Sequence, residues 1–287
     1  VLTSLGLLSI NQSHCMPPYT MIRTRSYWPY YLAALACALF LLILINVRID
    51  GRLFAVDQSI YRQLQLLRTP WLDDILITVT QLGDTLMVTV ITGVVALWLL
   101  VRKSWRTAGY WVLTIISSAV INTSIKAAIV RTRPGDMMYS GWSAYSFPSG
   151  HTTSNIVLYG LLCILIYPCI EKRAARILTV CCAMGFALLI AASRIYLGAH
   201  WFSDVLGGIL VSTLILCIAG ARYHAGRTHA LTAGAFLIPI LATLLIVGSV
   251  HVWHGRHVSM QRYTPPALPD QAPGNTPPPA AAATGTP

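Results

Sequence analysis

A histidine and an aspartate stand four residues apart in the polar connection before an apolar run. They are His200 and Asp204. Helical spacing would put both side chains on one face, within hydrogen-bond reach. A carboxylate on one imidazole nitrogen fixes the tautomer and raises the basicity of the other nitrogen, which is the logic of nucleophile–base–acid triads. A capping pair at a helix start would give the same spacing, so the pair alone leaves both interpretations open.

A second segment, Ser146-Phe-Pro-Ser-Gly-His151, stands directly before another apolar run. Its Pro-Ser-Gly sequence is typical of a turn. The turn would place the Ser149 hydroxyl and the Gly150 backbone N–H at a helix start, where anions bind readily. The usual pKa of a histidine lies close to neutral pH, so His151 is expected to be able to shuttle a proton. A plain helix N-terminus with an interfacial histidine is the alternative.

A third segment is basic, and runs from Lys126 to Arg133 and Pro134. Seven residues are about two helical turns, so Lys126 and Arg133 could point the same way before Pro134 ends the element. Arginine and lysine both suit phosphate, and Arg194 adds another cation shortly before His200. A basic helix end that interacts with the helix dipole would look similar. Arg131, inside this segment, could touch a substrate edge or pair with a loop.

The elements that must position these segments are membrane spans. The chain has 287 residues, of which 55% are hydrophobic and only 10% charged. Apolar runs close to the length of a bilayer crossing recur along it. We therefore expect an all-α, polytopic membrane helical bundle with six core transmembrane helices and a seventh. The expected spans are roughly 30–47, 85–101, 107–125, 152–167, 177–192, 204–221 and 231–250.

Four parts of the chain can be told apart by composition. Residues 1–26 are expected to be an N-terminal tail with an uncertain start, and 27–228 a membrane domain with the three segments at 126–204. Residues 229–252 hold the seventh run. Residues 253–287 are rich in proline and alanine, and are expected to be a disordered tail.

Basic residues indicate the orientation of the bundle. The formal net charge is +11, and Arg23/Arg25, Arg102–Arg106, Lys172–Arg176 and Arg222/Arg227 occupy alternate loops. The positive-inside rule makes that face cytoplasmic, so the three segments face outward. Cations on the outer face need a reason, which could be an anionic ligand or pairing with the acidic stretch before residue 85. Because the basic residues are scattered between spans, nucleic acid is not an expected partner.

Taken together, the three segments resemble the signature of the type 2 phosphatidic acid phosphatase superfamily: Lys-x6-Arg-Pro, Pro-Ser-Gly-His and Ser-Arg-x5-His-x3-Asp. Every fixed position is filled, by Lys126, Arg133, Pro134, Pro148, Ser149, Gly150, His151, Ser193, Arg194, His200 and Asp204. The resemblance implies that His200 attacks phosphorus, Asp204 orients His200 and His151 protonates the leaving oxygen. It also implies that Lys126, Arg133, Ser149, Gly150 and Arg194 hold the phosphoryl oxygens.

The expected function is hydrolysis of a phosphomonoester or pyrophosphate lipid, such as undecaprenyl pyrophosphate or phosphatidic acid, through a phosphohistidine. No carboxylate cluster suits magnesium or zinc, so we expect neither metal nor cofactor. The expected partners are a phosphorylated lipid and the bilayer, and the expected location is a bacterial inner membrane with the site facing the periplasm or exterior. Two alternatives stay open: a lipid phosphotransferase using the same intermediate, and a non-catalytic membrane protein that binds or transports anions. The sequence leaves the oligomeric state open.

Overall fold

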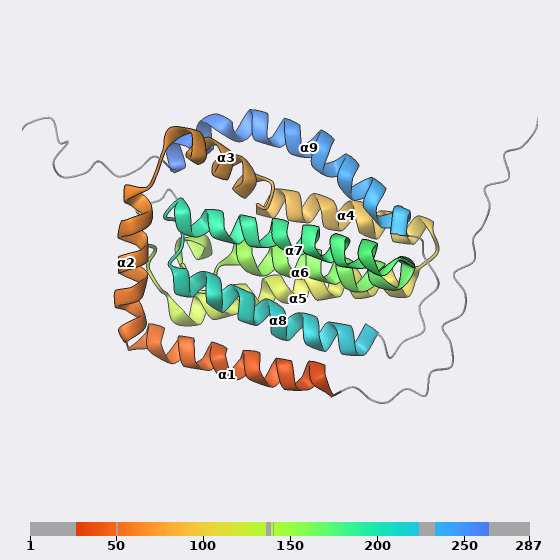
Figure 1. Cartoon of the computed structure of the whole chain (residues 1–287), viewed down its shortest axis with the longest axis horizontal. Coiled ribbons are helices and arrows are strands. Elements are labelled where there is room, and N and C mark those ends of the chain that lie inside the picture. Colours follow the sequence, from red (N-terminus) through yellow and green to blue (C-terminus); the bar gives the residue numbers. More distant parts are fainter. Residues whose placement is uncertain (1–26, 50, 136–138, 140, 224–232, 264–287) are drawn as a thin grey trace, which may run out of the picture.

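The computed structural model describes residues 27–49, 51–135, 139, 141–223 and 233–263 (Figure 1). Every regular element in these ranges is helical. The α-helices are α1 (Trp28–Arg48), α2 (Arg52–Leu66), α3 (Pro70–Gln81), α4 (Thr85–Val101), α5 (Trp105–Ile129), α6 (Gly150–Ile166), α7 (Arg173–Tyr196), α8 (Phe202–Tyr223) and α9 (Ala233–Arg262). Short 3-10 turns occur at η1 (Gly141–Ala144) and η2 (Tyr167–Cys169). The expected tail at residues 1–26 lies outside the described residues.

Six of the described helices are long and apolar enough to cross a bilayer. A seventh crossing results if α3 and α4, which meet at a bend of 41°, form one broken span. The 17 residues of α4 are fewer than the roughly 20 that a crossing usually needs, and α3 supplies the remaining length. The expected all-α bundle of transmembrane helices is confirmed.

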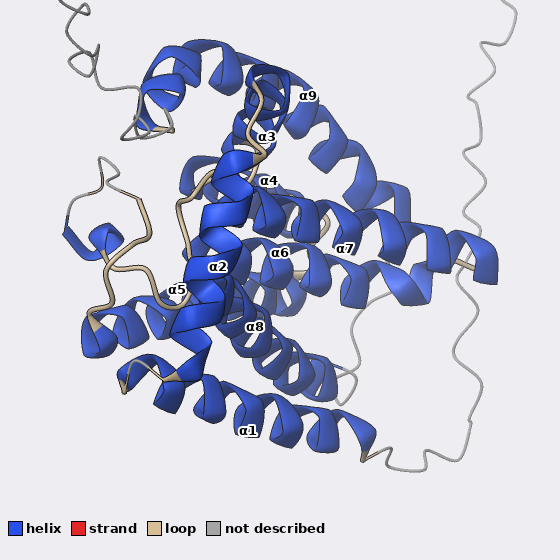
Figure 2. Cartoon of the chain, turned by 60° about the vertical axis from the view of Figure 1, so that its left-hand side comes forward, coloured by secondary structure: helices blue, strands red, loops and turns tan. Residues whose placement is uncertain are grey.

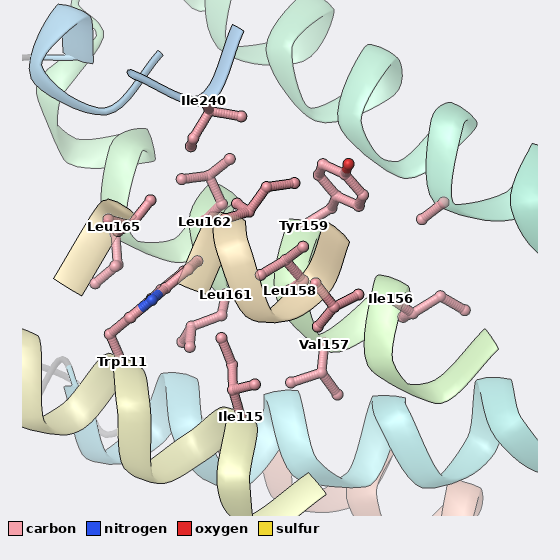
Figure 3. Packing of buried hydrophobic residues seen from close by; sticks show 14 of the residues in the cluster. Trp111, Ile115, Ile156, Val157, Leu158, Tyr159, Leu161, Leu162, Leu165 and Ile240 are labelled. Carbon is pink, nitrogen blue, oxygen red and sulfur yellow. The ribbon is translucent and has the colours of Figure 1, made fainter. Parts of the chain in front are cut away.

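Helix α6 forms the centre of the bundle and packs against α5, α7 and α8. Of its membrane-span window 72% is buried, against 17% for α1 and for α7. Figure 3 shows Leu158, Leu161 and Leu162 of α6 between Trp111 of α5 and Ile240 of α9. The outer helices expose apolar side chains such as Leu42 and Leu178, as expected for surfaces that face lipid.

Helix α2 lies across one end of the bundle, roughly perpendicular to the spans (Figures 1 and 2). The ends of α5 and α7 and the beginnings of α6 and α8 meet beneath it. There Ser149 N donates to the Asp204 carbonyl at 3.0 Å, and Ser203 N donates to Asp57 of α2 at 2.8 Å. Three sequence segments that are far apart along the chain therefore share this end.

The expected boundary between residues 252 and 253 is wrong, because α9 continues across it. The seventh run was expected at 229–252, with a disordered tail from 253, but the helix continues to Arg262. Its last turns are held by polar contacts, because Gln81 Nε2 donates to Ser259 Oγ at 2.5 Å and Arg256 pairs with Asp74 at 2.9 Å. The rest of the expected tail, 264–287, lies outside the described residues.

Candidate active site

His200 and Asp204 form a buried dyad at the start of α8. Nδ1 of His200 lies 3.3 Å from Oδ2 of Asp204, and both side chains are almost completely enclosed. His200 precedes the helix rather than lying on it, and Asp204 Oδ2 also accepts from the Trp201 backbone N–H at 2.9 Å. A proton on Nδ1 would satisfy Asp204 and leave the Nε2 lone pair for chemistry.

Arg133 meets the other nitrogen of the same imidazole. Its Nη1 lies 3.0 Å from His200 Nε2 and donates to the Ala199 carbonyl at 2.5 Å. Burial lowers the pKa of Arg133 to about 10, so the guanidinium stays charged near neutral pH. The Nε2 nitrogen of His200 therefore faces a cation, where a phosphoryl oxygen could bind.

The charge state of His200 follows from this setting. Burial, reinforced by the charges of Arg133 and Lys126, lowers the pKa of His200 well below its usual 6.5. The imidazole is thus neutral at physiological pH. A neutral imidazole keeps the lone pair that a nucleophile needs.

Asp57 of α2 is linked to the dyad by Arg131, which hydrogen-bonds to both Asp57 and Asp204. Arg131 Nη1 donates to Asp204 Oδ1 at 2.6 Å, and its Nη2 donates to Asp57 Oδ2 at 2.8 Å. Asp57 also accepts from the Ser203 hydroxyl and backbone N–H. Of the two roles open for Arg131, pairing with the acidic stretch is the one observed. Nothing in the sequence distinguished Asp57 from the other acidic residues of that stretch.

The basic segment is not the continuous helix that was expected between Lys126 and Arg133. Helix α5 ends at Ile129, and Val130 follows with φ 55 in the left-handed region, so Arg133 lies in a loop rather than two helical turns above Lys126. Lys126 Nζ donates to the carbonyls of Tyr145 and Ser146. It therefore ties the loop before α6 to α5 while remaining close enough to act electrostatically on His200.

The segment before α6 forms the expected turn and helix start. The Ser149 hydroxyl accepts from Thr152 N at 3.4 Å and caps α6, and Gly150 begins the helix beside Lys126. A Cβ on Gly207 of α8 would lie only 2.7 Å from the Phe147 ring, so glycine there allows α8 to approach this turn closely. His151 follows in the first turn, within electrostatic reach of Arg194, Arg133 and Lys126.

Arg194, near the end of α7, is buried and held by three hydroxyl groups. Its Nη1 donates to Thr80 at 2.8 Å and to Tyr263 at 2.6 Å, and its Nη2 donates to Tyr139 at 2.7 Å. The Tyr139 ring also packs against the guanidinium groups of Arg133 and of Arg262. Tyr263 and Arg262 were not expected at the site, because both fall within the tail predicted at 253–287.

All the expected site residues therefore gather at one end of the bundle. They are Lys126, Arg133, Ser149, Gly150, His151, Arg194, His200 and Asp204. Chemically, the arrangement offers a neutral imidazole that could act as a nucleophile, a second imidazole and several cations around one point. That combination suits in-line displacement at phosphorus.

The chain is similar to several known proteins. Residues 107–227 match the family model described as the PAP2 superfamily. Phosphatidylglycerophosphatase B of Bacillus subtilis (strain 168) is 29% identical over 182 residues, which cover 62% of this chain and 88% of that protein. Two proteins named lipid A 1-phosphatase, from Rhizobium johnstonii and Rhizobium etli, are each 30% identical over 132 residues, about half of their own length.

A solved structure shares the fold. It is the crystal structure of a transmembrane PAP2 type phosphatidylglycerolphosphate phosphatase from Bacillus subtilis. It superposes with a TM-score of 0.60 at 25% sequence identity, covering 70% of this chain and 98% of that one. The family match ends at residue 227, before α9 begins at Ala233.

Proposed function

Because this chain carries a PAP2 superfamily domain at residues 107–227, we propose that it is a membrane lipid phosphatase that works through a phosphohistidine on His200. The observation that carries the proposal is the environment of that ring. Asp204 binds one nitrogen, and the other nitrogen faces Arg133 within a buried cationic site. The names of the relatives from Bacillus and Rhizobium support a lipid as substrate.

In the first step, the His200 Nε2 lone pair attacks phosphorus while the bond from phosphorus to the lipid oxygen breaks. Protonated His151 gives its proton to the departing oxygen, so the lipid leaves as an alcohol, or as a lipid monophosphate if the substrate is a diphosphate. Asp204 stabilises the positive charge that grows on the imidazole. Arg133, Arg194 and Lys126 stabilise the equatorial oxygens, where the transition state concentrates its charge.

In the second step, water attacks the phosphohistidine. His151, now neutral, accepts a proton from that water, and the bond between Nε2 and phosphorus breaks. Inorganic phosphate leaves, His200 is neutral again and His151 is protonated again. Both steps balance without a redox partner or a further co-reactant.

The cations and the start of α6 supply the charge stabilisation that a metal would otherwise give, so we propose a metal-independent reaction. Within the described ranges no three His, Cys, Asp or Glu side chains gather in a way that could hold a metal ion. Full phosphate release after exhaustive chelation is expected. Activity that disappears with EDTA and returns with added magnesium would contradict this part of the proposal.

The substrate is proposed to be a phosphomonoester or diphosphate lipid, with phosphatidic acid and undecaprenyl pyrophosphate as candidates. Its tail would stay in the bilayer while the phosphate enters the end of the bundle under α2. The basic residues Arg102, Arg106, Arg173 and Arg222 lie at the opposite ends of α4, α5, α7 and α8. By the positive-inside rule this favours a bacterial inner membrane protein with an outward-facing site.

The test is a panel of mono- and diphosphate lipids presented to purified protein in mixed micelles. Phosphate release from at least one lipid, abolished in His200→Ala, is the expected result. Transfer of labelled phosphate to an acceptor lipid with no free phosphate would point instead to a phosphotransferase. Normal turnover by His200→Ala would overturn the assignment of His200.

A further inference from the structure

The end of α9 lies inside the active site, although α9 lies beyond the family match. Tyr263, which follows the last helical residue, is only 4% exposed. Its hydroxyl lies 2.6 Å from Arg194 Nη1 and 3.1 Å from the Tyr139 hydroxyl. Its backbone carbonyl accepts from Arg68, which Asp73 of α3 holds through two hydrogen bonds. The tyrosine is therefore fixed at both ends.

Helix α9 packs against α3 and α4, and polar contacts hold its second half there. His251 Nε2 lies 2.7 Å from Asp84, the residue that caps α4, and Ser259 accepts from Gln81 one turn before Tyr263. Side chains held in this way by surrounding hydrogen bonds are suited to precise positioning. The position of Tyr263 thus follows from the packing of α9 rather than from a flexible tail.

Arg194 keeps unused donors on one edge. A guanidinium has five N–H donors, and Thr80, Tyr263 and Tyr139 accept three of them. The remaining donors are Nε–H and a second hydrogen on Nη2. Nε is buried and has no hydrogen-bond partner within the part of the chain that the structure describes. The Nε–Nη2 edge of a guanidinium can bind two oxygens of one phosphate.

The three partners are hydroxyl groups, and this matters for the charge. A carboxylate at the same place would neutralise the arginine and weaken its attraction for an anion. Hydroxyl groups fix the direction of the guanidinium and leave its positive charge intact. Thr80, Tyr139 and Tyr263 together are called the hydroxyl clamp below.

We propose that Tyr263 is a positioning residue for phosphate binding, which acts by turning Arg194 so that its Nε edge faces the phosphoryl oxygens. The proposal rests on the proposed function, since it takes Arg194 as a phosphate ligand. Under this proposal α9 contributes to phosphate binding, because it places Tyr263 beside Arg194, in addition to crossing the membrane.

The test uses Tyr263→Phe in the full chain, which removes one hydroxyl and keeps the ring. Losing a hydrogen bond to a charged group should lower kcat/KM about tenfold and weaken competitive inhibition by inorganic phosphate by a similar factor. The melting temperature in detergent should stay close to that of the parent protein. Tyr159→Phe is the matched control, because its buried hydroxyl has no hydrogen-bond partner among the described residues and its loss should leave activity unchanged.

A double-mutant cycle separates positioning from a merely structural role. In an Arg194→Lys background, Tyr263→Phe should cost less than about twofold, because the group that it orients is gone. Thr80→Val, which removes another hydroxyl of the clamp, provides a second variant and should show the same dependence on Arg194. Equal losses in both backgrounds, or unchanged kcat/KM and phosphate inhibition in Tyr263→Phe, would overturn the proposal.

If the proposed function itself were wrong, the experiment would give a different result from a failure of the Tyr263 proposal. In that case the parent protein itself would release no phosphate from any lipid. Calorimetric titration with inorganic phosphate would then still test the clamp: weaker phosphate binding by Tyr263→Phe supports it, and unchanged binding refutes it.

Discussion

Arg131 Nη1 lies 2.6 Å from Oδ1 of Asp204, the carboxylate that binds His200. The other nitrogen of the same guanidinium binds Asp57, so a helix outside the three signature segments helps to set the direction of the His200 ring. The site is therefore supported by contacts that cross between α2, the loop after α5 and the start of α8.

Replacing Asp57 should weaken both the fold and catalysis. Asp57→Asn removes one of the two carboxylates that neutralise the largely buried Arg131, and breaking a buried pair typically costs about 3–5 kcal/mol. We expect a lower melting temperature in detergent, and a lower kcat because Asp204 is held less firmly. Asp74→Asn is the control, since the Asp74–Arg256 pair is exposed and should contribute little. Unchanged stability and kcat in Asp57→Asn would contradict this role.

The pH profile should report the lowered pKa of His200. Because the proposed nucleophile is the neutral His200 ring, kcat/KM should fall on the acid side only as pH drops through that pKa, well below 6.5. Arg133→Gln removes a nearby positive charge, so the acid limb should move toward higher pH. Comparing both proteins on one substrate cancels the ionisation of the substrate itself. An acid limb that stays in place would contradict the electrostatic account.

The same shift predicts how His200 contributes to stability. The unfolded chain binds a proton near the usual pKa of 6.5, whereas the folded site resists protonation. The contribution of His200 should therefore be fully present above that value and be lost as pH falls toward the folded pKa. Melting temperatures of the parent protein and His200→Gln should differ in their dependence on pH below 6.5. Parallel curves would argue against a buried neutral ring.

The proposed role of His151 as a proton donor can be tested with substrates whose leaving groups differ in their need for a proton. A lipid alkoxide needs a proton as it departs, so His151→Gln should lower lipid turnover by about 10²–10⁴-fold. A p-nitrophenolate ion leaves without a proton, so hydrolysis of p-nitrophenyl phosphate should suffer much less in the first step. Phosphohistidine should then accumulate, because the attacking water also lacks its base. Equal losses on both substrates, without accumulation, would assign His151 a different role.

Gly207 should be intolerant of a side chain. Alanine there would place Cβ 2.7 Å from the Phe147 ring and push α8 away from the turn that leads to His151. Overpacking of this kind typically costs about 1–3 kcal/mol, and we expect activity to fall with it. Gly93→Ala is the matched helical control, since nothing lies within 4 Å of its added Cβ. A Gly207→Ala protein as stable and active as the control would show that the contact relaxes freely.

Much of this site could be predicted from the sequence, because the signature residues stand next to apolar runs whose ends must lie at a membrane surface. His151 stands directly before one such run, and Asp204 stands at the start of another. The left-handed Val130, which ends α5 early, could not be foreseen, since valine rarely adopts that conformation. Asp57 and Tyr263 were also beyond prediction. Their roles depend on how α2 and α9 pack against distant segments, and neither carries a local pattern that indicates burial.

The central claim is that His200 carries the phosphoryl group during turnover. The most direct measurement is a rapid alkaline quench of the enzyme with lipid labelled in its phosphate, followed by mapping of the labelled peptide. The account predicts an acid-labile, alkali-stable label on His200 that is absent from His200→Ala. Steady turnover with no label on the protein, or a label on another residue, would contradict it.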